Sequence, residues 1–396
     1  MSHKAELKAA ILRNVQEILP MLEQQEKDIE AARRLPDAVV QSLKNTGVFS
    51  MAMPESLGGA ELDPIAQIEI IETLSRASAA AGWCTMIGSD SGYFSAFLAP
   101  DLAREMYPSA DTITAAAISQ TGKARRVPGG YRVSGRWPFS SGCQQSEWLV
   151  AGCKVYDGDT MARLEGTNIP ETLQVFFHKS DVNILDTWNS LGLRGSGSHD
   201  FVAEDVFIPE EKSFSFQRPV SHQPGALYRF PLAFMFNFAA VPLGVAARAI
   251  DLLSQAASAP TRQVTQAGVF LEDKCLKDEG FVQDALGRAQ TKLKAARAFY
   301  HSEVSDIWEQ ITLGQPLDGL TQTGFLAMNT EVFGMCEDIV EMLAKVRGGS
   351  VVYHGNPFEQ ALRDVITINQ HVMTSWRNYS QVGRVLLGVP PEEILL

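Results

Sequence analysis

Hydrophobic and polar positions follow three different patterns along the chain, and the first pattern is helical. Residues 37–47 lie between Pro36 and a terminal glycine, which predicts a short helix. Asp63 and Pro64 open a second segment, in which apolar residues recur at helical spacing. The stretch 77–83 is small and apolar, and we expect it to be buried. The first hundred residues are therefore predicted to be helical.

From about residue 112 to residue 209 the pattern is that of strands. Short runs rich in Val, Thr, Phe and Trp are separated by glycine-rich turns, and ten of the nineteen prolines lie between Pro100 and Pro242. The clearest runs are 131–133, 148–155, 173–177 and 201–207. This composition predicts an all-β insert, either a small barrel or a sandwich.

Beyond about residue 230 the chain is helical again. One predicted helix runs towards Trp308, and its apolar face is Phe281, Ala285, Ala289, Leu293 and Ala296. Another ends at Gly348-Gly349, and a last one spans roughly 357–387. Long amphipathic helices with short connections predict an antiparallel bundle. We divide this α+β chain into a helical domain (1–110), a β domain (111–215) and a helical bundle (216–396).

Composition and charge exclude several classes of protein. The net charge of −12 and the absence of a prominent Lys/Arg cluster argue against nucleic-acid and membrane-surface binding. We find no apolar run near 18 residues and no signal peptide. The five cysteines are widely spaced, which fits a reducing cytoplasm. No H-E-x-x-H or similar spacing of histidines predicts a metal site.

Four motifs carry a family resemblance over about 300 residues. Residues 53–59 read MPESLGG, 129–142 read GGYRVSGRWPFSSG, and 191–198 read LGLRGSGS. The fourth combines Gly348-Gly349 with the pair Arg363-Asp364. In this order they resemble the acyl-CoA dehydrogenase superfamily. The resemblance implies an N-terminal helical domain, a central β-barrel or sandwich domain and a C-terminal four-helix bundle.

Details of these motifs indicate a branch of that superfamily. The sequence F-S-S-G at 139–142 is similar to the flavin-dependent monooxygenases, the oxygenase halves of two-component systems. This resemblance implies reduced FMN or FAD, O2, a C4a-hydroperoxyflavin, and oxygenation of a small, mostly apolar substrate that is aromatic or carries a heteroatom. It also implies a homotetramer. The chain's G-x-G at 195–197 lies in β sequence and lacks a third glycine, so we expect a separate flavin reductase to supply electrons.

The catalytic candidates are His371 and Ser141. The common dehydrogenases carry a glutamate base eight residues after the aspartate of the Arg-Asp pair, and Val372 stands there in this chain. The monooxygenase branch has a histidine in this stretch, and His371 stands seven residues after Asp364. We expect His371 to lie on the last helix and to titrate near neutrality, either as a base or as a stabiliser of the peroxyflavin.

The cofactor candidates come from three parts of the chain. They are Phe139, Ser140, Ser141, Arg262, Gly348 and Gly349. By the resemblance, the Ser141 hydroxyl would lie beside flavin N5, and Arg262 would reach the pyrophosphate of a flavin in a neighbouring subunit. The alternatives are turn chemistry at Ser141, a surface role for Arg262 and a helix C-cap at Gly348-Gly349.

The substrate candidates are Ser91, Tyr93, Phe234 and Phe238. Ser91 falls near a position where many aromatic hydroxylases of this branch carry a histidine, so Asp90 or Tyr93 would have to compensate; a helix-end cap is the alternative for Asp90. Phe234 and Phe238 could line a pocket or begin a buried helix. Two other functions stay open: an FAD-dependent acyl-CoA dehydrogenase with a relocated base, and a non-catalytic flavin-fold binding protein.

Overall fold

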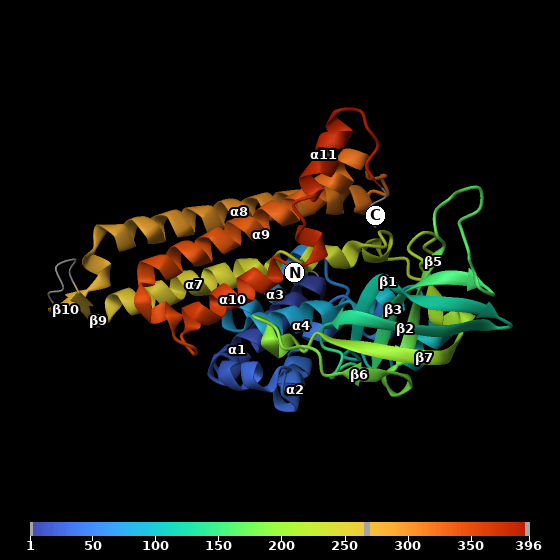
Figure 1. The fold of residues 1–396 in the computed structure, drawn as a ribbon, viewed down its shortest axis with the longest axis horizontal. Coiled ribbons are helices and arrows are strands. Elements are labelled where there is room, and N and C mark those ends of the chain that lie inside the picture. The colour runs from blue at the N-terminus through green and yellow to red at the C-terminus, as the bar shows by residue number, and fades with distance from the viewer. Residues whose placement is uncertain (1–2, 265–269, 393–396) are drawn as a thin grey trace.

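The computed structural model of the chain describes residues 3–264 and 270–392. Within these ranges, side chains are described for residues 3–259 and 275–392. An N-terminal helical layer, a central sheet and a long C-terminal bundle follow one another, and the sheet lies at one end of the molecule (Figure 1). The N-terminal helices are α1 (His3–Ala32), α2 (Asp37–Thr46), α3 (Pro64–Ala77), α4 (Ala79–Ser89), α5 (Ser91–Ser95) and α6 (Pro100–Met106). The bundle consists of α7 (Ala240–Ser258), α8 (Gly280–Thr312), α9 (Gly319–Arg347), α10 (Pro357–Ile368) and α11 (Asn378–Leu386).

The predicted N-terminal helices are confirmed together with their caps. Gly47 ends α2 with φ of 85°, a left-handed conformation that glycine adopts without strain. The Asp63 side chain accepts a hydrogen bond from Ala66 N at 2.9 Å, and Pro64 takes the first position of α3. The stretch 77–83 is buried as expected, and it contains the end of α3 and the beginning of α4.

The β region forms one mixed sheet. Its strands are β1 (Thr114–Val127), β2 (Gly130–Ser140), β3 (Trp148–Asp157), β4 (Thr160–Met161), β5 (Thr172–His178), β6 (Asn183–Leu185), β7 (His199–Pro209) and β8 (Ser213–Phe214). They are ordered β6-β7-β2-β1-β3-β5-β8, with β4 on β3, and the β1–β3 pair alone is parallel. All four predicted runs lie in strands. Trp137 fills the core on one face of the sheet, where it stacks on Phe201.

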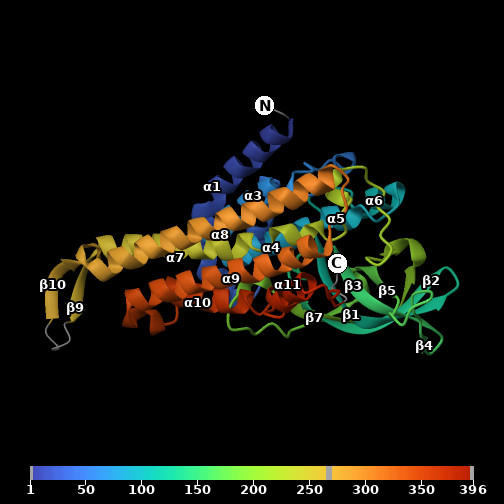
Figure 2. The ribbon, with the colours of Figure 1, turned by 90° about the horizontal axis from the view of Figure 1, so that it is seen from above.

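The bundle helices α7 to α10 pack side by side along the long axis (Figure 2). The expectation that the chain has no long apolar run is wrong: the segment 233–258 is apolar and long enough to cross a membrane, and 89% of its most apolar window is buried inside the protein, as in a core helix. The predicted inward face of α8 is right except at Phe281, which is 55% exposed; Val282 is buried in its place. A short hairpin of β9 (Pro260–Val264) and β10 (Phe270–Cys275) joins α7 to α8 at the far end.

The prediction of a single last helix over 357–387 is wrong. The chain breaks after α10, makes the short 3₁₀ turn η10 (Val372–Thr374) and then begins α11. Side chains satisfy the local backbone in this break: Thr374 Oγ1 donates to the carbonyls of Asn369 and His371, at 3.0 and 2.7 Å. Such side-chain bonds compete with helical ones, which is why the helix does not continue.

Close contact between α10 and the 191–194 loop joins the bundle to the β domain. A Cβ on Gly192 would lie 2.0 Å from the carbonyl oxygen of Arg363, so only glycine fits. Leu193 N donates to Asp364 Oδ1 at 2.7 Å, and Arg363 Nη1 donates to Leu191 O at 2.8 Å. The Arg-Asp motif and the L-G-L-R motif therefore bind each other, and this contact fixes the start of the following segment, η4 (Arg194–Ser196), relative to α10.

Candidate active site

Trp83 on α4 connects the two predicted catalytic residues. Its indole Nε1 donates to Ser141 Oγ at 2.9 Å, and its ring lies edge-on to His371 with centroids 5.7 Å apart. Phe238 packs against both rings, at 6.0 Å from Trp83 and 4.8 Å from His371. Tertiary folding thus brings together side chains from α4, the loop after β2, the segment before α7 and the segment after α10.

Ser141 belongs to a buried row of hydroxyls. Its Oγ lies 2.6 Å from Ser198 Oγ, which lies 2.7 Å from Ser196 Oγ. The backbone supports this row, because the carbonyl of Ser196 accepts from Gly142 N at 2.9 Å and from Cys84 Sγ at 3.5 Å. The 139–142 and 194–198 loops are therefore fixed to each other and to α4.

Beside this row, Phe139 lies at the surface in a strained conformation. Its φ is 62°, which is uncommon for a residue other than glycine, and its side chain is 69% exposed. The ring meets Trp188 edge-on at 6.3 Å. Next to it, the Ser140 hydroxyl is buried and lacks a protein partner among the described residues. An exposed aromatic ring and an incomplete buried hydroxyl are features of a surface that binds a ligand.

His371 lies in the break after α10, whereas the sequence placed it on a helix. Its Nδ1 accepts from Met373 N at 3.3 Å, so the proton of the neutral ring is on Nε2. Burial of the ring lowers the pKa of His371 to about 4, because a charged imidazolium is poorly solvated there. The expectation of titration near neutrality is therefore corrected: the ring is neutral at pH 7.

The substrate candidates lie in an aromatic cluster next to this site. Tyr93 contacts Phe234 at 6.4 Å between ring centroids, and its hydroxyl donates to Gln67 Oε1 at 3.3 Å. The Ser91 hydroxyl is taken up by the backbone, since it donates to Gly88 O and accepts from Thr114 N. Asp90 makes no cap bond from its side chain, and burial raises its pKa well above the usual range. Asp90 does occupy the helix-end position between α4 and α5, as the capping alternative expects, but it caps α4 through its backbone N–H and not through its side chain.

Three cofactor candidates lie away from this site. Gly348, with φ of 83°, ends α9 at the end of the bundle where α10 begins, whereas His371 follows the other end of α10. Twelve helical residues correspond to about 18 Å of separation. Gly349 follows directly in the 3₁₀ turn η9 (Gly349–Val352), and a side chain on either glycine would meet open space. Arg262 lies in the β9–β10 hairpin, and its side chain is outside the described residues.

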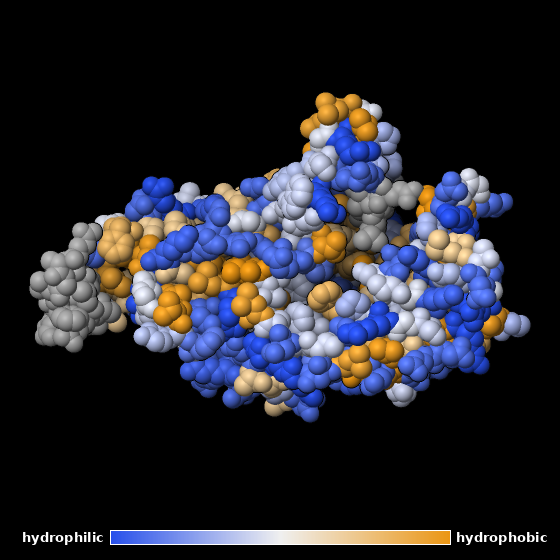
Figure 3. Space-filling view, viewed as in Figure 1, coloured by the Kyte–Doolittle hydropathy of each residue, from blue (hydrophilic) through white to orange (hydrophobic). Residues whose placement is uncertain are grey.

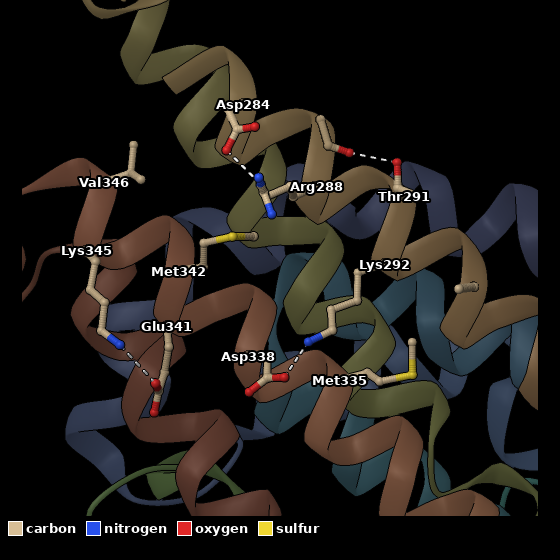
Figure 4. Close-up of a pocket in the computed structure, with 12 residues that line it drawn as sticks. Asp284, Arg288, Thr291, Lys292, Met335, Asp338, Glu341, Met342, Lys345 and Val346 are labelled. Atoms are coloured by element: carbon tan, nitrogen blue, oxygen red, sulfur yellow. Dashed lines mark hydrogen bonds and ion pairs between the residues drawn. The ribbon is translucent and has the colours of Figure 1, made fainter. Parts of the chain in front are cut away.

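A large groove on the outer face of the bundle is a different kind of feature. It measures about 1140 Å³ and runs between α8 and α9 (Figure 4). Its charges pair with one another: Arg288 with Asp284 at 2.7 Å, Lys292 with Asp338, and Lys345 with Glu341 at 3.4 Å. The residues around Trp83 do not line it. Figure 3 shows a separate recess between the bundle and the sheet domain on the viewed face.

Sequence reasoning missed three residues of the site. No role is assigned to Trp83, Ser196 or Ser198 from the sequence. A signal existed for the two serines, because they flank Gly197 in a G-S-G-S turn. Nothing in the sequence indicates that Trp83 donates to Ser141, since the two residues are 58 positions apart.

The residues of the site fit a flavin. The Ser141 and Ser140 hydroxyls, the exposed Phe139 ring and the Trp188 indole offer polar and stacking contacts of the kind a flavin ring uses. When bound, reduced flavin supplies the electrons that activate O2. The chain's own residues supply a neutral imidazole and a buried hydroxyl row, which can bind and orient the reacting groups without adding charge.

Comparisons with known proteins agree with this assignment. "Acyl-CoA dehydrogenase, N-terminal domain" matches residues 6–99 and "Acyl-CoA dehydrogenase, C-terminal domain" matches residues 236–376, together more than half of the chain. The indole-3-acetate monooxygenase of Pseudomonas putida is 28% identical over 368 residues, which cover 92% of this chain and 90% of that protein. The oxygenase subunit HsaA of a flavin-dependent monooxygenase from Rhodococcus jostii is 24% identical, with coverages of 94% and 97%.

Solved structures share the fold over nearly the whole chain. XiaF from Streptomyces sp., in complex with FADH2 and glycerol, superposes with a TM-score of 0.88 at 22% identity, covering 99% of this chain and 98% of that one. The 3-HSA hydroxylase from Rhodococcus sp. RHA1 gives a TM-score of 0.85 at 22% identity, with coverages of 98% and 99%. The chain belongs to the acyl-CoA dehydrogenase superfamily and is one of its flavin-dependent monooxygenases, which use reduced flavin and O2.

Proposed function

We propose that this chain is the oxygenase component of a two-component system and receives reduced FMN or FAD from a separate reductase. O2 forms a hydroperoxide at flavin C4a, and one oxygen atom passes to a small, mostly apolar substrate, aromatic or with a heteroatom. The observation that carries this proposal is the position of Trp83, which contacts Ser141 on one side and His371 on the other.

We assign His371 the role of a neutral hydrogen-bond donor. Its Nδ1 accepts from Met373 N, so Nε2 carries the proton, and no protein acceptor for Nε2 lies in the described part of the chain. A low pKa makes the ring a weak base at pH 7, which favours donation to an oxygen over removal of a substrate proton. The sequence left open whether His371 acts as a base or stabilises the peroxyflavin.

Aromatic side chains support an apolar substrate. Phe238 packs on His371, and Phe234 packs on Tyr93, so the ring wall continues from the catalytic histidine into the N-terminal helices. Similar proteins are named indole-3-acetate monooxygenase and p-hydroxyphenylacetate 3-hydroxylase, oxygenase component, and both names specify aromatic acids. We infer a substrate of similar size and polarity.

A homotetramer, working in the cytoplasm, would complete the flavin site. Gly348 and Gly349 lie at the opposite end of α10 from His371, and the β9–β10 hairpin lies at the far end of α7, so we expect both to meet a flavin held mainly by a neighbouring subunit. Exposed Trp376 and Leu387 flank α11, which projects from the bundle (Figure 1). Sedimentation of the purified protein tests this arrangement, and a monomer at micromolar concentration would contradict it.

Rapid mixing tests the proposed function directly. The protein is mixed anaerobically with reduced FMN or FAD and then with oxygenated buffer, while absorbance is followed. A transient band of a flavin–oxygen adduct that forms before oxidised flavin is the expected result. Immediate appearance of oxidised flavin, at the rate of free flavin, would contradict the proposal. Tight oxidised FAD that bleaches with an acyl-CoA would indicate a dehydrogenase instead.

A further inference from the structure

His199 is a buried histidine to which the site described above gives no role. It is 2% exposed and begins β7, where it pairs across the sheet with Ser140 at the end of β2. Its Nδ1 accepts from Thr187 N and from Trp188 N, both at 3.1 Å. A backbone amide can only donate, so Nδ1 carries no proton and the proton of the neutral ring is on Nε2. One ring nitrogen thus holds two consecutive amides of the 186–188 loop.

These bonds fix the backbone of Trp188, whose ring belongs to the surface that fits a flavin. The indole Nε1 of Trp188 donates to Leu193 O at 2.9 Å, and its ring meets the exposed Phe139 ring edge-on at 6.3 Å between centroids. Trp188 is therefore held at three points: at its backbone by His199, at its indole nitrogen by Leu193 and at its ring by Phe139.

The two amides depend on His199 to different degrees. Thr187 N has a second acceptor, Leu185 O, at 2.9 Å. Trp188 N has none other than His199 Nδ1 in the part of the chain that the structure describes. An amide that loses its acceptor in a part-buried position is costly. Loss of the Nδ1 lone pair would therefore act mainly on Trp188.

The charges around His199 decide its protonation state. Asp186 Oδ1 lies 3.8 Å from Nδ1 and is itself bound by Arg33 at 2.8 Å, and Asp200 follows His199 on β7. Burial lowers the pKa of His199, and the charge of Asp186 opposes this effect only in part, so the pKa lies below its usual range. The ring is neutral at pH 7. If it were protonated, Nδ1 would turn from Trp188 N towards the oxygens of Leu185 and Asp186.

We propose that His199 is a positioning residue for the flavin: its neutral ring holds Trp188 against Phe139, and its protonation releases Trp188 and weakens flavin binding. The proposal rests on the proposed function, because it takes the flavin to lie against these two aromatic rings. His199 acts through Trp188 and is not itself a contact of the flavin.

Two variants separate the acceptor of the ring from its charge. In His199→Asn the amide oxygen stands the same number of bonds from Cα as Nδ1, so it can accept from Trp188 N, and it is not protonated. His199→Leu fills the space without an acceptor. At pH 7.5 we expect His199→Asn to bind chemically reduced FMN or FAD within about threefold of the wild type, and His199→Leu to bind on the order of tenfold more weakly. Anaerobic titration measures both affinities.

The pH profile tests the charge. The ratio of wild-type to His199→Asn affinity at each pH cancels the titration of the flavin and of other groups. We expect this ratio to be constant from pH 8 to pH 7 and to fall as the pH decreases towards 5, since only the wild type loses its acceptor. His178→Asn is the matched control, because the exposed His178 also accepts a backbone amide at Nδ1, from Ser180 N at 3.3 Å. The ratio of wild-type to His178→Asn affinity should not change with pH.

Hydrogen exchange gives a readout that needs no flavin. In the flavin-free protein at pH 7.5, the amide of Trp188 should exchange faster in His199→Leu than in the wild type or in His199→Asn, as measured by mass spectrometry of peptides that cover residues 186–190. If His199→Leu fails to fold, the pH profile with His199→Asn decides.

The outcomes separate this proposal from the proposed function. Equal flavin affinity and equal exchange in His199→Leu and the wild type would overturn the proposal, and so would a ratio of wild-type to His199→Asn affinity that stays constant down to pH 5. In both cases the wild type still binds flavin, and the proposed function stands. A wild type that binds neither FMN nor FAD in reduced form would overturn the proposed function and this proposal together.

Discussion

The Trp83 junction, which consists of Trp83, Ser141, Phe238 and His371, and the groove between α8 and α9 both contain polar side chains. The two regions differ in the charge and the burial of these side chains. In the groove, charged residues lie near the surface and neutralise one another in pairs such as Lys292–Asp338. Around Trp83 the polar groups are neutral and buried, and the Ser140 hydroxyl and the Nε2 hydrogen of His371 have no partner in the described part of the protein. We therefore expect the chemistry at the Trp83 junction and not in the groove, because buried polar groups without partners gain hydrogen bonds from a ligand, whereas paired surface charges gain little.

Loss of the histidine should give the largest effect and is the strongest test of this contrast. We expect His371→Ala to slow oxygen transfer by roughly 10²–10⁴, the usual range for a positioned acid–base or donor group. Hydrogen peroxide should rise in step, measured by a peroxidase-coupled assay with a suitable aromatic substrate. His354→Ala, at a side chain that is 93% exposed, serves as the control. If His371→Ala transfers oxygen as fast as the wild type and releases no additional hydrogen peroxide, His371 has only a structural role.

The neutral state of His371 also predicts how the oxygen-transfer rate depends on pH. Because burial lowers the pKa of His371 to about 4, the ring stays neutral from pH 5 to pH 8. We expect no step in the oxygen-transfer rate near pH 6.5 that depends on His371, and a loss only as pH falls towards 4. Single-turnover rates of wild type and variant across this range check the prediction; a His371-dependent inflection near neutrality would contradict it.

The contact between α10 and the β domain should matter for stability. Asp364 Oδ1 accepts from the buried Leu193 N, and Asp364→Ala should lower the free energy of unfolding by about 1–3 kcal/mol by leaving that donor unpaired. Asp364→Asn keeps an acceptor and should cost less. Urea denaturation of the two variants measures the difference, and equal losses would indicate that the bond is unimportant.

The raised pKa values of two buried carboxyl groups, Asp364 and Glu26, predict that the stability of the protein depends on pH. Burial raises the pKa of Asp364 to about 7 and that of Glu26 to about 8, and the charge of Asp364 raises the pKa of Glu26 further. The folded protein therefore binds protons more tightly than the unfolded chain, so stability should fall as pH rises from about 4 to about 8. Glu26→Gln should flatten this dependence in denaturation curves recorded at pH 5 and pH 8. A wild type that gains stability over this interval would contradict the sign.

Removal of the hydroxyl at the centre of the junction should weaken flavin binding. Ser141→Ala is expected to cost about 1–3 kcal/mol of flavin affinity through the lost hydrogen bond, with the fold intact. Equilibrium titration with FMN and FAD measures the loss, and Ser146→Ala is the matched control in the same loop. Unchanged affinity for both oxidation states would leave Ser141 with a role in the turn only.

The smallest effect is expected in the groove. Lys292→Ala breaks an exposed ion pair with Asp338, and exposed pairs contribute about 0–1 kcal/mol. Unfolding of this variant and its oxygen-transfer rate should both stay close to the wild type. A large loss of activity would show that the groove participates in catalysis and would remove the contrast with the Trp83 junction.

The sequence by itself determined the features that depend on near neighbours. Caps at Asp63 and Gly47, the strand runs rich in Val, Thr, Phe and Trp, and the apolar stripe of α8 all involve residues within a few positions of one another, so local patterns predict them. The F-S-S-G loop and the absence of a glutamate at Val372 likewise indicated the monooxygenase branch from residue identity alone.

Only the tertiary structure decided what depends on distant contacts. The last helix breaks because the side chains of His371 and Thr374 form hydrogen bonds with neighbouring backbone groups, although their spacing is compatible with a helix. The neutral state of His371 follows from burial, which a sequence does not display. Trp83 meets Ser141 across 58 residues, and Leu193 meets Asp364 across 171. Packing of separate elements sets these distances, so no local pattern could have predicted them.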